Sequence, residues 1–140
     1  MITFTSDREV GEWVRKRIPG IERWMDEYVC FGIVMPGQLG IPVIMAGVVY
    51  DAYTGHDINM HMAIDDMRAV NRKTLKAAFS FPFVTLNCLR VTGLVPSKNE
   101  KARSFDERLG FVLEGTKKFA FPDDDELIYG MYRDQCRWLK

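Results

Sequence analysis

At 140 residues, 47% of them hydrophobic, the chain has room for one domain, residues 1–140, with one substantial core. Nineteen acidic and nineteen basic residues cancel, which excludes a global field that draws the protein to nucleic acid or membrane, although local patches stay open. The three cysteines, Cys30, Cys88 and Cys136, lack metal or redox spacing, so we expect buried thiols in the cytoplasm and no metal site.

The first thirty residues predict a strand and two short helices. Residues 2–5 suit a strand, and Ser6 with Glu9 has the spacing of a capping box, so a helix should run to about Ile18. Pro19 and Gly20 end it, and a second short helix is predicted over residues 21–28. Charged residues at positions 7–9 interrupt any apolar run, so no signal peptide is predicted.

The middle of the chain predicts a hairpin, a strand and a helix. Residues 29–35 and 41–53 flank a Pro-Gly-Gln-Leu-Gly turn, which favours an antiparallel hairpin over a membrane span. Residues 57–64 alternate apolar and polar side chains, so this strand should be half-buried, with Asp57 and His61 on its polar face. A helix is expected from Arg68 to about Ser80, after which Pro82 should bend the chain.

Residues 90–115 predict a strand, a helix and a strand. The β-branched run 90–95 ends at Pro96, and residues 99–109 place Ala102, Phe105 and Leu109 at helical intervals. Ser97 or Asn99 can cap the start of this helix, and Gly110 can adopt the left-handed conformation at its end.

This segment resembles the GNAT (GCN5-related N-acetyltransferase) superfamily, and more closely the branch that acetylates ribosomal-protein N-termini. The similarity rests on Asn99, the Leu-Gly-Phe of residues 109–111 and the Glu-Gly of residues 114–115; the tail 127–139 is similar to the ending of small acetyltransferase-like proteins of phages. The resemblance implies an α+β fold with a mixed, mainly antiparallel sheet of six or seven strands and about four helices. The strands at 57–64 and 90–95 should be its central parallel pair, splayed at their C-terminal ends.

The resemblance also implies an acetyl-CoA site on the strand 57–64 and the helix after it. The backbone of Met62, Ala63 and Ile64 should pair with the pantetheine arm, which Asn99 and Phe105 should face from the other side. The loop that binds the pyrophosphate should begin at Arg68, with N-H groups of Val70 to Lys73, that is Val70, Asn71, Arg72 and Lys73, on the phosphates. The family's small residues are absent from this loop, and the cations of Arg68, Arg72, Lys73 and Lys76 are the alternative source of affinity, unless they are ordinary solvated residues.

For catalysis the resemblance implies direct attack of an amine on the thioester, assisted by a base on the cofactor-binding strand. Asp57, eleven residues before Arg68, and His61 are the candidate catalytic residues, although a lone strand histidine is more often structural. The family's frequent general acid is a tyrosine seven residues after Asn99, where this chain has Asp106. That departure leaves Tyr129, Tyr132, a water or substrate positioning alone to do this work.

Two functions therefore stand side by side. The first is an acetyl-CoA-dependent N-acetyltransferase that acts on an unidentified amine, namely a protein N-terminus, a lysine or a small amine. The second is a GNAT-fold protein, in a phage-related setting, that has lost catalysis and binds a protein partner. We expect no membrane partner, nucleic-acid binding lacks the interleaved exposed aromatics it needs, and a homodimer stays open. Trp13 and Trp24 are core residues in one interpretation and walls of the acceptor groove in the other.

Overall fold

The computed structural model describes residues 2–6, 8–25 and 27–140. Its seven strands form a sheet in the order β1-β2-β3-β4-β5-β7-β6, in which β4 (Asn59–Ile64) and β5 (Arg90–Pro96) run parallel through the pair Asn59 and Thr92. The pairs β1–β2, β2–β3, β5–β7 and β6–β7 are antiparallel. The predicted mixed, mainly antiparallel sheet with its parallel pair is confirmed.

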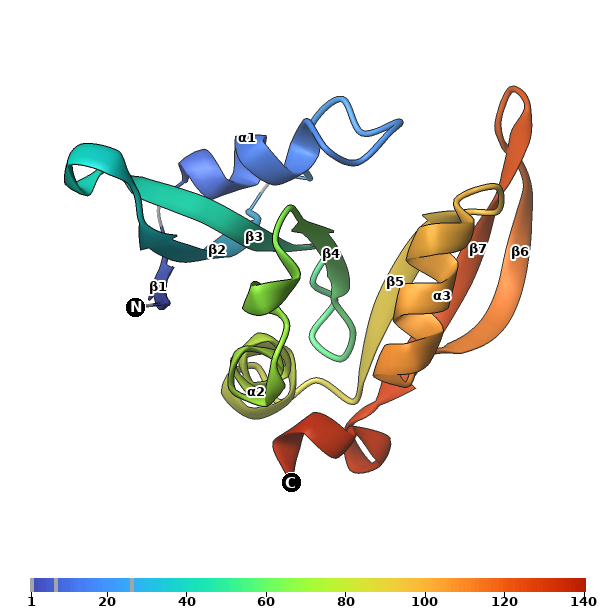
Figure 1. The fold of residues 1–140 in the computed structure, drawn as a ribbon. Helices are drawn as coiled ribbons and strands as arrows, with labels where there is room; N and C mark the ends of the chain where they lie inside the picture. Colours follow the sequence, from blue (N-terminus) through green and yellow to red (C-terminus); the bar gives the residue numbers. More distant parts are fainter. Residues whose placement is uncertain (1, 7, 26) are drawn as a thin grey trace. The chain divides into compact units, whose positions relative to one another are not determined.

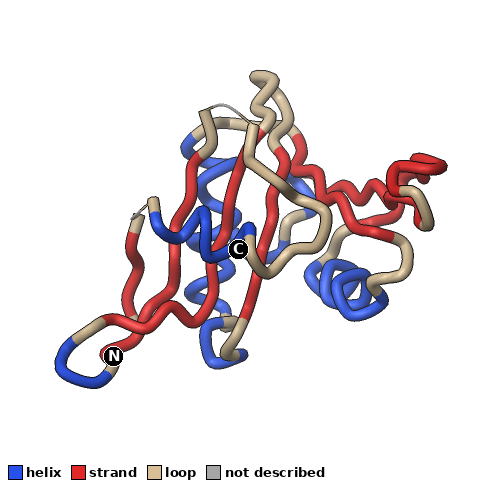
Figure 2. Tube along the Cα trace, turned by 90° about the horizontal axis from the view of Figure 1, so that it is seen from above, coloured by secondary structure: helices blue, strands red, loops and turns tan. Residues whose placement is uncertain are grey.

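The chain divides into two compact units, each traced in Figures 1 and 2. The first contains Met1–Ala52 and His61–Ala78, and the second contains Tyr53–Met60 and Phe79–Lys140. The strand β4 and the helix α2 (Arg72–Ser80) each contribute residues to both units. The expectation of a single domain stays a prediction.

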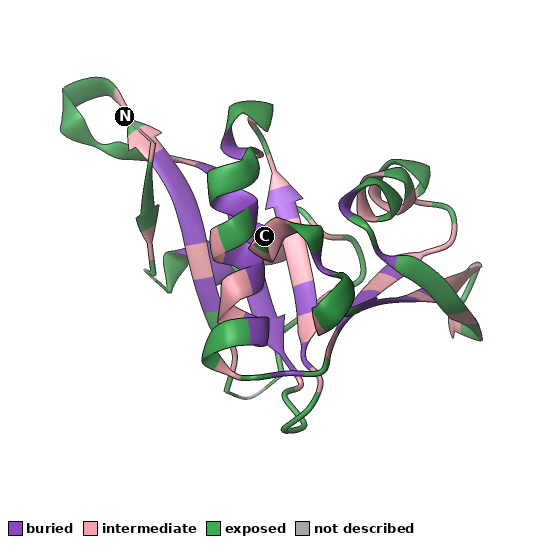
Figure 3. Cartoon of the chain, turned by 90° about the horizontal axis from the view of Figure 1, so that it is seen from below, coloured by how far each residue is buried: buried purple, intermediate pink, exposed green. Residues whose placement is uncertain are grey.

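In the first unit the helix α1 (Glu9–Arg15) packs on the hairpin of β2 (Val29–Pro36) and β3 (Pro42–Asp51), beside which β1 (Thr3–Thr5) pairs with β2. A side chain at Gly47 would place its Cβ 2.5 Å from Val14, so glycine permits the close approach of the helix. Val10, Val14, Trp24 and Ala63 lie in one core cluster, and much of β2 and β3 is buried (Figure 3).

Three local predictions in this unit are corrected. The capping box does not form, because α1 begins only at Glu9, and its N-cap, Arg8, has no side-chain cap. The described residues of 21–28 form bends rather than a second helix, so the described part of the chain contains three α-helices. The polar face expected on residues 57–64 is not left to solvent, since Ala63 is buried in the core and Trp24 lies against His61.

The start of the predicted helix 68–80 also differs. Residues Met67–Ala69 form a 3-10 turn, and α2 begins at Arg72 because Asn71 and Thr74 cap it reciprocally. At the other end, Phe81–Thr85 continue as a π-helical turn rather than a bend, which accommodates Pro82 near its first position.

In the second unit β5 pairs with β7 (Asp124–Tyr132), and β7 pairs with β6 (Val112–Phe121). The helix α3 (Glu100–Leu109) precedes β6. As predicted, Asn99 caps it by accepting a hydrogen bond from Ala102 N at 3.2 Å, and Gly110 ends it in the left-handed conformation with φ of 116°. As expected, Cys30, Cys88 and Cys136 are buried, and none of them forms a disulfide within the described residues.

Candidate active site

The sequence-predicted site residues lie in both units, and the two candidate catalytic residues have different surroundings. His61 and the cofactor candidates from Met62 to Lys73 belong to the first unit. Asp57, Asn99 and Phe105 belong to the second. Each group is therefore built from the elements of its own unit.

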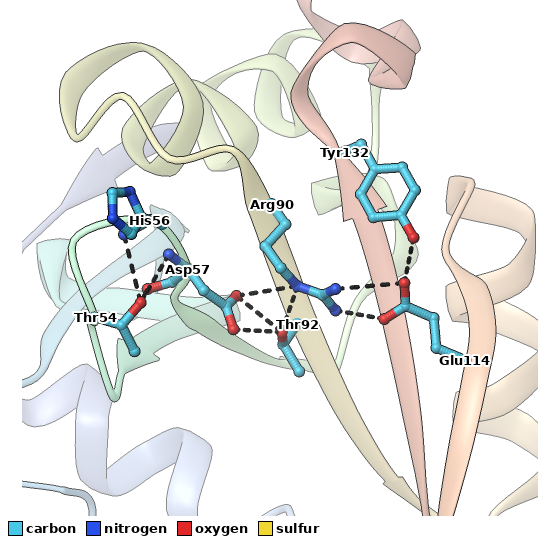
Figure 4. Close-up of polar contacts among 7 residues, drawn as sticks. All are labelled: Thr54, His56, Asp57, Arg90, Thr92, Glu114 and Tyr132. Atoms are coloured by element: carbon cyan, nitrogen blue, oxygen red, sulfur yellow. Dashed lines mark hydrogen bonds and ion pairs between the residues drawn. The ribbon is translucent and has the colours of Figure 1, made fainter.

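In the second unit the Asp57 side chain belongs to a polar network that joins residues from four segments of the chain (Figure 4). Both carboxylate oxygens accept from the Thr92 hydroxyl, at 2.8 and 2.9 Å, and Arg90 Nε lies 3.6 Å from Oδ1. The Asp57 backbone N-H donates to Thr54 Oγ at 3.1 Å, and this turn fixes the position of Asp57. The carboxylate is thus held by Thr92 and lies near Arg90, both of the same unit.

Arg90 joins Asp57 to a second carboxylate. Its Nη2 donates to Glu114 Oε1 at 2.5 Å, and the Tyr132 hydroxyl also donates to Glu114 (Figure 4). The hydrogen bond from Arg90 lowers the pKa of Glu114, whereas the bond to Glu114 raises the pKa of Tyr132. A Cβ on Gly130 would lie 2.5 Å from Glu114 Oε1, so glycine there makes room for the ion pair.

In the first unit His61 is paired with Asp51, which sequence reasoning missed. His61 Nε2 lies 2.8 Å from Asp51 Oδ1, and the two side chains are 10% and 7% exposed. The backbone N-H of Met25 donates to the other carboxylate oxygen at 3.3 Å, and the Trp24 ring lies 4.9 Å from the imidazole. The available signal was a single carboxylate at the end of a long uncharged strand, where burial demands a partner.

The loop expected to bind pyrophosphate is tied to an acidic residue that the sequence analysis passed over. Asp66 accepts from Arg68 Nη2 at 2.6 Å and from the Arg68 backbone N-H at 3.0 Å. These bonds lower the pKa of Asp66 to about 2, so it is ionised at neutral pH. The cation of Arg68 is thus shared with a carboxylate.

Two of the backbone N-H groups predicted to bind the phosphates already donate hydrogen bonds within the turn. Val70 N donates to Met67 O at 3.0 Å, and Asn71 N donates to Thr74 Oγ at 3.0 Å. The side chains of Arg72 and Lys73 are exposed on the first turn of α2. Positive charge at this helix start therefore comes from the helix proper rather than from the loop before it.

On α3, Asn99 serves as the cap already described and Phe105 is half-buried. Beside Phe105 lies Asp106, whose Oδ2 would be 3.3 Å from a Cβ built on Gly93. Burial, and secondarily the charge of Glu107, raises the pKa of Asp106 to about 7. This carboxyl can therefore exist in its protonated form near neutral pH.

Within the described residues, no cluster of three or more His, Cys, Asp or Glu side chains is arranged to hold a metal ion. No helix in the same part of the chain is both long enough and apolar enough to cross a membrane.

No protein-family model and no curated protein matches the sequence. Solved structures do match, and they define the class of fold: the chain has the fold of the GNAT acetyltransferases, as the sequence resemblance predicted.

One similar structure is a spermidine N-acetyltransferase from Vibrio cholerae in complex with CoA and spermine, with 15% identity, a TM-score of 0.73, and coverage of 99% of this chain and 98% of that one. A GNAT-family acetyltransferase from Bacillus anthracis is 17% identical over 75% of this chain and 66% of its own, with a TM-score of 0.60. A ribosomal-protein-S5-alanine acetyltransferase from Vibrio fischeri is 20% identical over 79% and 64%, with a TM-score of 0.58.

Proposed function

We propose that the protein transfers an acetyl group from acetyl-CoA to an amine. The observation that carries this proposal is the GNAT fold over nearly the whole chain, shared with an acetyltransferase whose structure contains CoA. The acceptor is a protein N-terminus, a lysine or a small amine.

The cofactor contacts follow from the two units taken separately. In the first, the backbone of Met62, Ala63 and Ile64 takes the pantetheine arm as an added strand would, and the phosphates bind at the start of α2. Because Val70 and Asn71 donate within the turn, the side chains of Arg68, Arg72 and Lys73 carry most of the phosphate binding. In the second unit, Asn99 and Phe105 contact the arm.

The chemistry needs a base for the amine. The amine nitrogen attacks the thioester carbonyl carbon, a C-N bond forms, the C-S bond breaks, and the amine gives a proton to His61, directly or through one water. The CoA thiolate takes its proton from water. Asp57 maintains the network around Arg90 instead of acting as the base.

The test of acetyl transfer uses labelled acetyl-CoA. The wild-type protein is incubated with a host-cell lysate and with a panel of peptides, polyamines and other small amines, beside the Asp57→Ala, His61→Ala double variant. We expect labelling by the wild type and a loss of about a hundredfold or more in the variant, the usual share of a general base. No labelling above background by the wild type contradicts the proposed function.

A second candidate function keeps one observation in its favour. Asp66 places an ionised carboxylate against Arg68, in the loop where the phosphates would bind, and this opposes cofactor affinity. A GNAT-fold protein that binds a protein partner without catalysis would tolerate this arrangement. Acetyl-CoA binding separates the two functions.

A further inference from the structure

The pair of Asp51 and His61 is the titratable cluster of the first unit that the sequence did not predict. It joins the last residue of β3 to β4, and its members are 7% and 10% exposed in their side chains. Both carboxylate oxygens are occupied, one by His61 Nε2 at 2.8 Å and one by the Met25 N-H at 3.3 Å. One oxygen of the Asp51 carboxylate thus accepts from the backbone of Met25, and the other lies against the imidazole of His61.

This geometry distinguishes the two nitrogens of the imidazole. A carboxylate only accepts hydrogen bonds, so in the neutral imidazole Nε2 carries the proton that it shares with Asp51, and Nδ1 keeps its lone pair. Nδ1 is not one of the fully buried side-chain nitrogens and oxygens without a partner in the described residues, where Arg103 Nε is the one such atom. The described structure shows no hydrogen bond from Nδ1.

The surroundings of the ring favour orientation over free rotation. Trp24 lies against the imidazole with ring centroids 4.9 Å apart, and its own Nε1 donates to Gly11 O at 2.8 Å. A ring fixed by an indole and a carboxylate loses little freedom when it accepts a proton.

We infer that Asp51 is a positioning residue that fixes His61 in the Nε2-H tautomer, so that Nδ1 is the nitrogen that accepts the proton of the acceptor amine. The inference rests on the proposed acetyl transfer, to which it adds the reacting atom and the group that orients it. When Nδ1 takes the proton, the imidazolium forms beside the Asp51 carboxylate, which stabilises its charge. No proton moves to Asp51 in this step.

The charged groups near the ring belong to few elements. Asp51, on β3, is the charged partner that the described residues present to it. Trp24 covers the ring and lies against Tyr28, over whose ring Arg8 stacks at 4.2 Å. A change of charge at Asp51 should therefore act directly on the imidazole to which it is bonded.

The first experiment is independent of activity. Nitrogen-15 NMR of the imidazole side chains in the wild-type protein reports which ring nitrogen carries the proton, with His61→Gln identifying the signals. We expect the Nε2-H tautomer at high pH. The Nδ1-H tautomer would overturn the inference, whatever the acetyl-transfer assays show.

The second experiment measures acetyl transfer over pH in Asp51→Asn and Asp51→Glu. Asp51→Asn keeps the shape and removes the charge, so kcat should fall about tenfold or more with little change in the KM for acetyl-CoA. Asp51→Glu should restore part of the rate.

Asp65→Asn is the matched control, because Asp65 is an ion-paired carboxylate of the same unit that bonds Arg17 at the surface. It should leave kcat and its pH profile unchanged. Wild-type kcat and pH profile in a folded Asp51→Asn would overturn the role of Asp51 while leaving acetyl transfer intact. Absence of transfer by the wild-type protein would overturn the proposed function, and this role with it.

Discussion

His61 and Asp57 lie four residues apart in the chain, yet their surroundings prepare them for opposite tasks. His61 shares Nε2 with the buried carboxylate of Asp51, and we propose that its Nδ1 accepts the proton of the amine. Asp57 gives both oxygens to Thr92 and lies 3.6 Å from a guanidinium. The difference shows that residue type and strand do not define a candidate base by themselves, because Asp57 lies in an ion-paired network and His61 beside a buried carboxylate.

The two networks also differ in how the negative charge of their carboxylates is neutralised. The Asp57 network contains one cation, Arg90, between two carboxylates, and its side chains are 24–29% exposed. The pair of His61 and Asp51 is more deeply buried and contains no permanent cation. We therefore assign proton transfer to the first unit's pair and structural cohesion to the second unit's network.

The largest effect should follow from His61→Ala. We expect kcat for acetyl transfer to fall about a hundredfold, because a general base commonly supplies that share. Asp57→Asn, the matched variant, should leave kcat close to the wild-type value. If Asp57→Asn is slower than His61→Ala in single-turnover measurements, the assignment of His61 rather than Asp57 as the base is contradicted.

Asp106 is a third carboxyl for this comparison, and its pKa is set by burial rather than by an ion pair. Its pKa is raised to about 7 from 3.8, so the folded protein binds more protons than the unfolded chain between these values, and stability falls as pH rises through them. The group faces Glu107, whose carboxylate also accepts from Tyr129, and Arg103 bonds Ser97 O from the same helix. Asp106→Asn should be more stable than wild type at pH 8 by roughly 2 kcal/mol, as measured by urea unfolding. An equal difference at pH 4 and pH 8 would contradict this origin.

Replacing Arg68 and Arg72 together by Ala should weaken acetyl-CoA binding by roughly tenfold or more, since charge-assisted bonds to phosphate are lost. Because Asp66 already pairs with Arg68, Asp66→Asn should tighten binding. Calorimetry on the three single variants and the double variant checks both changes. Unchanged affinity in the double variant would move the phosphate site elsewhere.

The smallest effect tests the cohesive role of the Asp57 network. Glu114→Gln should lower stability at pH 7 by about 1 kcal/mol, because Arg90 loses a charged partner. The folded-state pKa of Glu114 is lowered, so its contribution is present above the unfolded value of 4.5 and is lost as pH falls through the folded value. The gap between wild type and variant should therefore close in acid. A constant gap would show that packing, not charge, is responsible.

The sequence predicted elements whose signals are local. The cap at Asn99, the left-handed Gly110 and the β-branched runs of β2, β3 and β5 each depend on neighbouring residues, and each was placed within a few positions. The capping box at Ser6 failed because other starts compete for the same helix, and the observed one lies at Glu9.

The site was less predictable because its partners are distant in the chain. Nothing near His61 indicates Asp51, ten residues earlier on another strand, or the Trp24 ring that covers it. The network of Asp57 requires Arg90 and Glu114, which only strand pairing brings together. Asp106 could be flagged by its position, but its raised pKa depends on burial that no spacing reveals.

Titration calorimetry with acetyl-CoA tests the central claim of an acetyl-CoA-dependent transferase most directly. The proposed function predicts one site per chain with a dissociation constant in the micromolar range, and weaker binding in the Arg68→Ala, Arg72→Ala variant. No heat of binding at millimolar acetyl-CoA, from protein whose fold is verified by circular dichroism, would contradict it.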